Sequence, residues 1–271
     1  MKTKILEKCI GAVIIIALLL ISGVMAKESS LQLEVKNEAE VETERSARDI
    51  IEEMDANMRG ESSYAEMTMI IERPRYTREV SIRSWALGND YSMILITAPS
   101  RDAGTTFLKR GNEIWNFVPS VDRTIKMPPS MMSQSWMGSD FTNDDLVNES
   151  SIVNDYEHSI IKEETYEGRE AWVIEMIPHE DAAVVWGKVL VWVCKDDMIQ
   201  LRVENYDQSD QLAQTMELEE IQEMGGRTIP TLMTMHPADK DQKTILRYEE
   251  LRFNIDEDES FFTQRNMQRI R

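Results

Sequence analysis

The sequence predicts a mainly β protein in which one antiparallel sheet curls around an interior. Three observations support this prediction. From Ser62 onward, apolar and polar residues alternate in short stretches separated by turn residues, which is typical of antiparallel strands. The stretch Val184–Lys195 is apolar on both faces of a strand, so each face needs cover. The segment Trp115–Phe141 breaks the alternation with three prolines and four methionines, and it is too apolar for an ordinary loop.

Residues 1–26 are typical of a secretory signal peptide. Three lysines precede an apolar core over Ile10–Val24, and residues 24–26 form a small-residue cleavage site. The alternative is an uncleaved membrane anchor, but the apolar run is shorter than the ~20 residues that span a bilayer. Cys9 lies before the apolar core rather than at the cleavage point, so we expect no acyl anchor. We therefore predict export to the periplasm.

The charge of the chain excludes some classes of partner. Residues 27–45 are acidic and lack aromatic residues, which predicts a flexible lead-in to a single domain over residues 46–271. The net charge is −19, and it would become −21 without residues 1–26. Nucleic acid and anionic lipid surfaces repel such a protein.

After cleavage Cys194 would be the sole cysteine, so we expect no disulfide and an inert buried thiol.

A helix is predicted over Ser46–Met58. Ser46 is a good N-cap with Asp49 three residues later, and Gly60 is suited to end the helix. Apolar residues recur between them at helical spacing, at Ile50, Ile51, Met54 and Met58. This apolar stripe predicts that the helix packs on something large, and the helix can be one of the covers that the sheet needs.

The strands are predicted from period-two alternation and from the turn residues between them. So many strands joined by short turns indicate a sheet that curls, because large flat sheets are unusual. A helical turn is expected at Asn143–Val147, and a short helix in the tail after Ser260. The predicted strands are Ser62–Glu72, Thr77–Leu87, Tyr91–Ala98, Thr105–Arg110, Glu113–Val118, Tyr156–Thr165, Arg169–Pro178, Val184–Lys195, Met198–Asp207, Gln211–Met224, Arg227–His236 and Thr244–Asn254.

Two interpretations of Trp115–Phe141 are open. Methionine is unbranched and polarisable, so it suits surfaces that accept variable apolar shapes. The segment would then lie across the mouth or inner face of the curved sheet and line an apolar cavity. Alternatively, it seals an ordinary core, because methionine is also a common core residue.

Catalytic and metal-binding motifs are missing from the sequence. His158, His179 and His236 are isolated, and we expect them at exposed turn or strand positions. There is no G-x-S-x-G, no phosphate-binding glycine loop and no C-x-x-C. We therefore expect no catalytic residue, no metal and no cofactor. An enzyme stays an alternative that would need a polar cleft with a perturbed carboxylate pair.

Four stretches carry a resemblance to a known family. They are MDANMRGESSYAEMTM (residues 54–69), FLKRGNEIWNFVPSVDRTIKMPPSMMSQSWMGSDFTNDDLV (107–147), AAVVWGKVLVWV (182–193) and EMGGRTIPTLMTMHPADK (223–240). In these the chain resembles the outer-membrane lipoprotein-sorting protein family, which has the LolA-like fold. It is most similar to the branch often encoded beside RND/MMPL-type exporters.

The resemblance implies an incomplete, open antiparallel β-barrel with a few helices covering its concave face. It also implies a periplasmic carrier that binds lipid, or the acyl chains of lipoproteins, in an apolar cavity and passes them between membrane partners. The alternative is a non-catalytic accessory subunit of an RND/MMPL-type membrane exporter. We expect a monomer that binds lipid or a lipidated protein and no nucleic acid.

Nine residues are candidates for contact with such a cargo. We expect cargo to enter where the Met127–Met137 cluster can move. Each large aromatic side chain among the candidates can instead be an ordinary core residue. The candidates are Met127, Met131, Met132, Trp136 and Met137 from the lid side, and Trp115, Phe117, Trp186 and Trp192 from the sheet.

Overall fold

The computed structural model describes residues 45–148, 152–182 and 184–270. The predicted signal peptide over residues 1–26 and all but the last residue of the predicted lead-in lie outside the described residues. Apart from Arg45, the described residues belong to one compact unit that begins at Ser46. None of the helices in this part of the chain is long and apolar enough to cross a membrane.

Thirteen antiparallel strands of the described residues form one sheet in the order β6-β5-β4-β3-β2-β1-β13-β12-β11-β10-β9-β8-β7. The bounds of all but β6 agree with the predicted strands to within a few residues. The strands are β1 (Ser62–Arg73), β2 (Tyr76–Leu87), β3 (Tyr91–Ala98), β4 (Thr106–Arg110), β5 (Glu113–Val118), β6 (Arg123–Lys126), β7 (Tyr156–Tyr166), β8 (Arg169–Pro178), β9 (Lys188–Cys194), β10 (Gln200–Tyr206), β11 (Leu212–Met224), β12 (Arg227–Pro237) and β13 (Lys243–Phe253).

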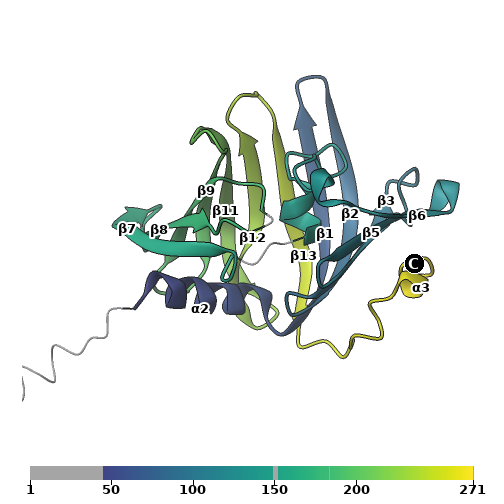
Figure 1. The fold of residues 1–271 in the computed structure, drawn as a ribbon, viewed down its shortest axis with the longest axis horizontal. Coiled ribbons are helices and arrows are strands. Elements are labelled where there is room, and N and C mark those ends of the chain that lie inside the picture. The colour runs from purple at the N-terminus through teal and green to yellow at the C-terminus, as the bar shows by residue number, and fades with distance from the viewer. Residues whose placement is uncertain (1–44, 149–151, 183, 271) are drawn as a thin grey trace, which may run out of the picture. The chain divides into compact units, whose positions relative to one another are not determined.

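The sheet consists of two meanders that meet at its centre. Strands β1 to β6 extend in one direction and β13 back to β7 in the other, and β1 pairs with β13 between them. Strands β6 and β7 are the two edges, so the sheet bends into an open barrel without closing. Figure 1 shows strands β7–β9 and β1–β5 as facing walls with β11–β13 between them. The predicted mainly β, open antiparallel fold is confirmed.

Irregular pairing accompanies this curvature. The register shifts in β1 between Glu66 and Met67, and in β2 between Ser81 and Ile82. The pairing of β10 shifts on both of its sides. A bulge of this kind bends a strand and increases its twist, which a sheet needs in order to curl.

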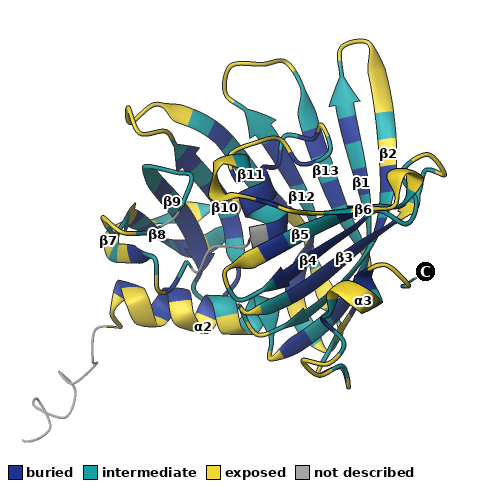
Figure 2. Ribbon diagram, turned by 45° about the vertical axis from the view of Figure 1, so that its right-hand side comes forward, coloured by how far each residue is buried: buried dark blue, intermediate teal, exposed yellow. Residues whose placement is uncertain are grey.

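Helix α2 (Ala47–Arg59) packs on the concave face, as predicted. Ser46 caps it by accepting a hydrogen bond from the Asp49 backbone N–H, and the Asp49 side chain accepts one from the Ser46 N–H in return. Its buried residues Ile50, Ile51 and Met54 contact the inner faces of β8 and β9. Figure 2 shows buried residues along one side of α2 and exposed residues along the other.

In addition to the expected helical cover of the concave face, one short helix covers the other face of the sheet. Helix α3 (Gln264–Met267) buries Met267 together with Phe262. Their partners Met93, Leu108 and Phe117 belong to β3, β4 and β5. Inward-facing neighbours on the same strands, such as Ile94 and Phe107, belong to the concave core instead. Strands β3 to β5 therefore place buried apolar side chains on both faces of the sheet.

The prediction that Trp115–Phe141 lacks strands beyond Val118 is wrong. Residues 123–126 form β6, which pairs with β5. Strand β6 is short and mostly exposed, with charged residues at both ends, so its composition does not show the alternation of a half-buried strand. The rest of the segment crosses the concave face and leads into the π-helical turn Asp144–Asn148.

Candidate functional site

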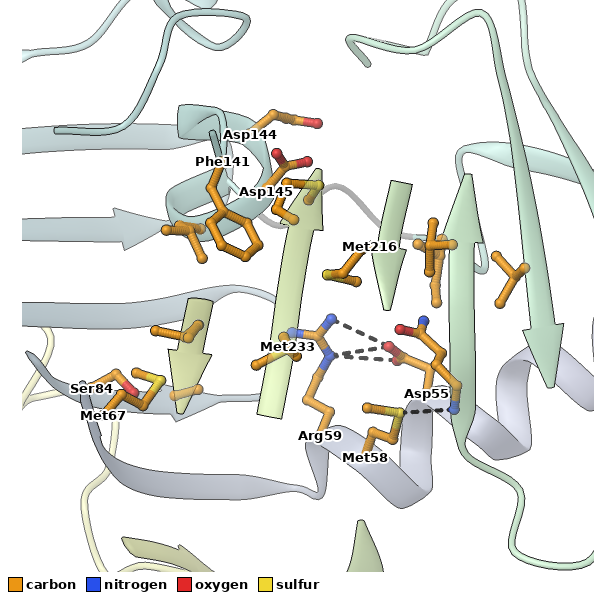
Figure 3. Close-up of a pocket in the computed structure, with 18 of the residues that line it drawn as sticks. Asp55, Met58, Arg59, Met67, Ser84, Phe141, Asp144, Asp145, Met216 and Met233 are labelled. Atoms are coloured by element: carbon orange, nitrogen blue, oxygen red, sulfur yellow. Dashed lines mark hydrogen bonds and ion pairs between the residues drawn. The ribbon is translucent and has the colours of Figure 1, made fainter. Parts of the chain in front are cut away.

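A cavity of about 360 Å³ lies on the concave face of the sheet. Its walls are the end of α2, the inner faces of β1 to β3 and β7 to β13, Trp136 and Phe141 of the segment that crosses the concave face, and the π-helical turn that follows it. A volume of this size lies at the small end of the range of about 300–1,000 Å³ that is usual for ligand sites. Figure 3 shows side chains from α2, the sheet and this segment converging on the cavity.

Methionine is the most frequent side chain in the cavity wall. The triplets Met67-Thr68-Met69 and Met233-Thr234-Met235 each place their two methionines on the concave face, because alternate residues of a strand share a face. Flexible thioether side chains let the wall adapt to an apolar guest. The lining methionines are Met54, Met58, Met67, Met176, Met216, Met233 and Met235.

The predicted contact residues divide between three places. Trp136 and Trp186 line the cavity. The methionines of the 115–141 segment pack into the neighbouring core, where Met127 and Met132 are buried and Met131 and Met137 are partly buried. Trp115 and Phe117 contact the α3 side of the sheet, and Trp192 lies on the outer face of β9 beside Tyr166. Ligand contact by any of the nine residues stays a prediction.

Sequence reasoning missed the methionines that do line the cavity. It concentrated on the clustered methionines of one segment, whereas the lining ones are spread over α2 and four strands. The signal was present in the two Met-Thr-Met triplets. Period-two placement of methionine predicts one methionine-rich face of a strand.

A buried ion pair ties the segment to the sheet. Arg73 Nη1 lies 2.8 Å from Asp140 Oδ2, and the two side chains are 11% and 3% exposed. Thr244 and Gln242 also donate to the Asp140 carboxylate, at 2.7 and 2.6 Å. Arg73 and Arg78 donate to the backbone carbonyls of Gly138 and Met137. These contacts hold residues 137–140 on the sheet, and entry of cargo where the Met127–Met137 cluster can move stays a prediction.

The charged side chains of the cavity wall occur at two places. In α2, Arg59 Nη2 lies 3.2 Å from Asp55 Oδ1. Across the cavity, in Figure 3, lie Asp144 and Asp145, with Met216 and Met233 between the two places. A guest therefore meets an apolar middle flanked by hydrogen-bonding groups.

Burial raises the pKa of Asp145 above its usual value. Hydrogen bonds from the Thr142 backbone N–H, at 2.7 Å, and from the Thr142 and Trp186 side chains act in the opposite direction, and the charge of Asp144 adds to the rise. Burial also raises the pKa of Tyr156, another lining residue. Desolvation disfavours the charged form of both groups, so the cavity favours neutral side chains.

Metal ligation has no support in the described ranges, where no group of three or more His, Cys, Asp or Glu side chains could hold an ion.

The expectation of exposed histidines is wrong, because His158, His179 and His236 are all half-buried. His158 is held by the Ile152 carbonyl, which lies 2.6 Å from its Nε2. Cys194 is a buried free thiol, as expected.

Comparison with known proteins decides the family. A family model whose description reads "Uncharacterized protein" matches residues 88–269, which is more than half of the chain. The chain belongs to this family. Within the matched range of the family lie β3 to β13 and the segment that crosses the concave face. No curated protein matches the sequence.

Solved structures share the fold of this family member. A DUF1329 family protein from Desulfovibrio piger superimposes with a TM-score of 0.76 at 24% identity, covering 82% of this chain and 98% of its own. A protein from Vibrio parahaemolyticus, described as an outer-membrane lipoprotein-sorting protein domain, gives 0.75 at 25% identity, with 82% and 98% covered. A LolA superfamily protein from Nitrosomonas europaea gives 0.71 at 24% identity, with 82% and 99% covered. The LolA-like fold and the resemblance to lipoprotein-sorting proteins are confirmed.

Proposed function

We propose that the protein is a periplasmic carrier that binds lipid, or the acyl chains of a lipidated protein, in the methionine-lined cavity and passes them between membrane partners. The observation that carries the proposal is an unfilled apolar cavity on the concave face of an open sheet. The likeness to a structure described as a lipoprotein-sorting protein domain supports it.

The energetics suit reversible transfer. Burying an acyl chain contributes about 0.8 kcal/mol for each CH₂, so about ten buried methylenes contribute ~8 kcal/mol. A membrane interior offers a chain a similar free energy. Handover between carrier and membrane is then close to balanced, and the carrier itself needs no nucleotide. An accessory role at an RND/MMPL-type exporter stays a prediction.

A pair of substitutions on one strand tests the carrier function. Ser84 lines the cavity from β2, whereas Ser81, three residues earlier, lies on the opposite face of that strand. Ser84→Trp fills the cavity, and Ser81→Trp adds the same side chain outside it. We measure the binding of the apolar fluorescent dye N-phenyl-naphthylamine, and we identify lipid that co-purifies from periplasm by native mass spectrometry.

We expect dye binding and lipid adducts in the wild type and in Ser81→Trp, and their loss in Ser84→Trp. Circular dichroism checks that both variants fold. A wild type that binds no dye and carries no lipid would contradict the proposal. Equal binding by the two variants would place the apolar site elsewhere.

A further inference from the structure

The chain's own side chains fill much of the concave face of the sheet. On one side, Trp136, Phe141 and Val147 are at most 2% exposed and form one core with inward-facing residues of β2 to β5. On the other side, Ile50 and Ile51 of α2 are fully buried against β8 and β9. The cavity of about 360 Å³ is the space that remains between these two covers.

The volume of the cavity matches one acyl chain. A methylene group takes about the same space as a water molecule in the liquid, ~30 Å³. The 360 Å³ of the cavity therefore hold roughly twelve methylenes. Two chains of about sixteen carbons need about 1,000 Å³ on the same scale, and three such chains need about 1,400 Å³. The difference of about threefold to fourfold excludes full burial of several long chains in this space.

Both covers are held by contacts that limit how far the cavity can widen. The buried pair of Arg73 and Asp140 ties the crossing segment to the sheet. At the end of α2, Arg227 of β12 donates to the carbonyl oxygens of Ala56 and Asn57, at 2.9 and 2.6 Å. The methionine side chains between the covers can change the shape of the cavity. A second long chain, however, would need one of the covers to move away from the sheet.

These observations together limit the cargo to one chain. Resting on the proposed carrier function, we infer that the cargo is a single-chain amphiphile whose chain fills the cavity while its polar head stays in water. Each methylene inside the cavity raises the affinity about fourfold, the equivalent of ~0.8 kcal/mol. A lipid with several long chains leaves most of its methylenes outside, so it gains less from the cavity than it loses by leaving a membrane.

A series of chain lengths tests the inference on the wild-type protein. Lysophosphatidylcholines share one head group and carry one chain, here of about 8 to 18 carbons, on both sides of the roughly twelve that the volume allows. Each is titrated, below its micelle concentration, against bound N-phenyl-naphthylamine. We expect the affinity to rise about fourfold for each added methylene up to about twelve carbons, and to level off beyond that length. A steady fourfold gain up to the longest chain would overturn the inference.

A matched pair of substitutions tests whether the cavity sets this limit. Ser84→Phe places a larger side chain in the cavity, whereas Ser81→Phe places it on the opposite face of β2. The added volume of about 100 Å³ equals roughly three methylenes. We therefore expect the affinity to level off about three carbons earlier in Ser84→Phe, and at the wild-type length in Ser81→Phe. Circular dichroism checks the fold of both variants. The same limiting length in both would show that the chain lies outside the cavity.

The mass of the natural ligand separates the inference from the carrier function. We expect the native mass spectrum of protein purified from periplasm to show one single-chain adduct for each protein, which the dye displaces. If the wild type binds neither dye nor lipid, the carrier function fails and the inference falls with it. If the dye displaces a stoichiometric lipid of two or three long chains, the carrier function holds and only the inference falls.

Discussion

Single residues hold the segment over the cavity. The Arg73–Asp140 pair is the strongest of these contacts because both side chains are almost fully removed from water. Most other ion pairs of the described chain are more exposed, such as Arg101–Asp102, in which Arg101 is 73% exposed. Exposed pairs contribute little to stability, whereas removing one partner of a buried pair leaves an uncompensated charge.

We predict that Asp140→Ala lowers the free energy of unfolding by about 3–5 kcal/mol, because it leaves the Arg73 guanidinium buried without its carboxylate. Urea denaturation measures the change. Arg101→Ala is the control and should stay within about 0.5 kcal/mol of the wild type. A loss at Asp140 as small as that of the control would mean that the segment is held by its apolar contacts alone.

The pH dependence of stability should report on His158. Burial lowers its pKa below the usual value; its hydrogen bond to Ile152 raises it, and the charges of Arg48 and His179 lower it further. On acidification the unfolded chain therefore takes up the proton first, at a pKa of about 6.5. The stability linked to His158 is complete above that pH and declines as the pH falls through it.

We expect His158→Gln to flatten the loss of stability between about pH 7.5 and pH 5.5, because glutamine does not titrate in this range and can still donate to the Ile152 carbonyl. Chemical denaturation of both proteins across the range gives the two slopes. Parallel curves for wild type and variant would refute the assignment.

At the scale of elements, α2 depends on its first turn as well as on its buried face. Ser46 and Asp49 form a reciprocal capping box, which satisfies two backbone N–H groups that the helix leaves unpaired. The opposite end places Asp55, Met58 and Arg59 in the cavity wall. The cap therefore contributes to the position of one side of the site.

We predict that Ser46→Ala costs about 1 kcal/mol of stability, the usual value for a lost N-cap. Thermal or urea unfolding followed by circular dichroism measures it. Ser133→Ala replaces an exposed serine with no such role and should change stability by less than about 0.5 kcal/mol. Equal effects at the two serines would show that α2 is positioned by packing alone.

The sequence predicted elements better than it predicted the site. Ser46, Gly60 and the period-two stretches act locally, so α2 and twelve of the thirteen strands were predictable. Strand β6 was not, because an exposed edge strand has little apolar patterning. The cavity wall depends on which faces of distant strands meet. Only Trp136 and Trp186 of the nine candidate residues line it, since one strand face cannot be assigned to inside or outside from local sequence.

At the scale of the whole molecule, the net negative charge opposes the compact folded state. The chain carries a net charge of −19, and folding brings these charges closer together. Self-repulsion of this kind destabilises the compact state. Salt screens it, because the Debye length falls from about 30 Å at 0.01 M to about 8 Å at 0.15 M.

We therefore expect the melting temperature to rise by about 2–4 °C over this range of sodium chloride, equivalent to about 1 kcal/mol for a chain of this size. Differential scanning calorimetry measures the shift. Chloride is used because sulfate stabilises proteins by exclusion from their surface. A fall in melting temperature would mean that the ion pairs of the fold, which salt weakens, outweigh the repulsion.

The pairing of β1 with β13 has a consequence for how the protein is made. The central pair of the sheet joins β1 and β13, the first and the last strand of the described part of the chain. The two halves of the sheet therefore cannot join through this central pair until synthesis is nearly finished. Contacts so distant along the chain form slowly, so the sheet is completed only after β13 has been synthesised and has paired with β1.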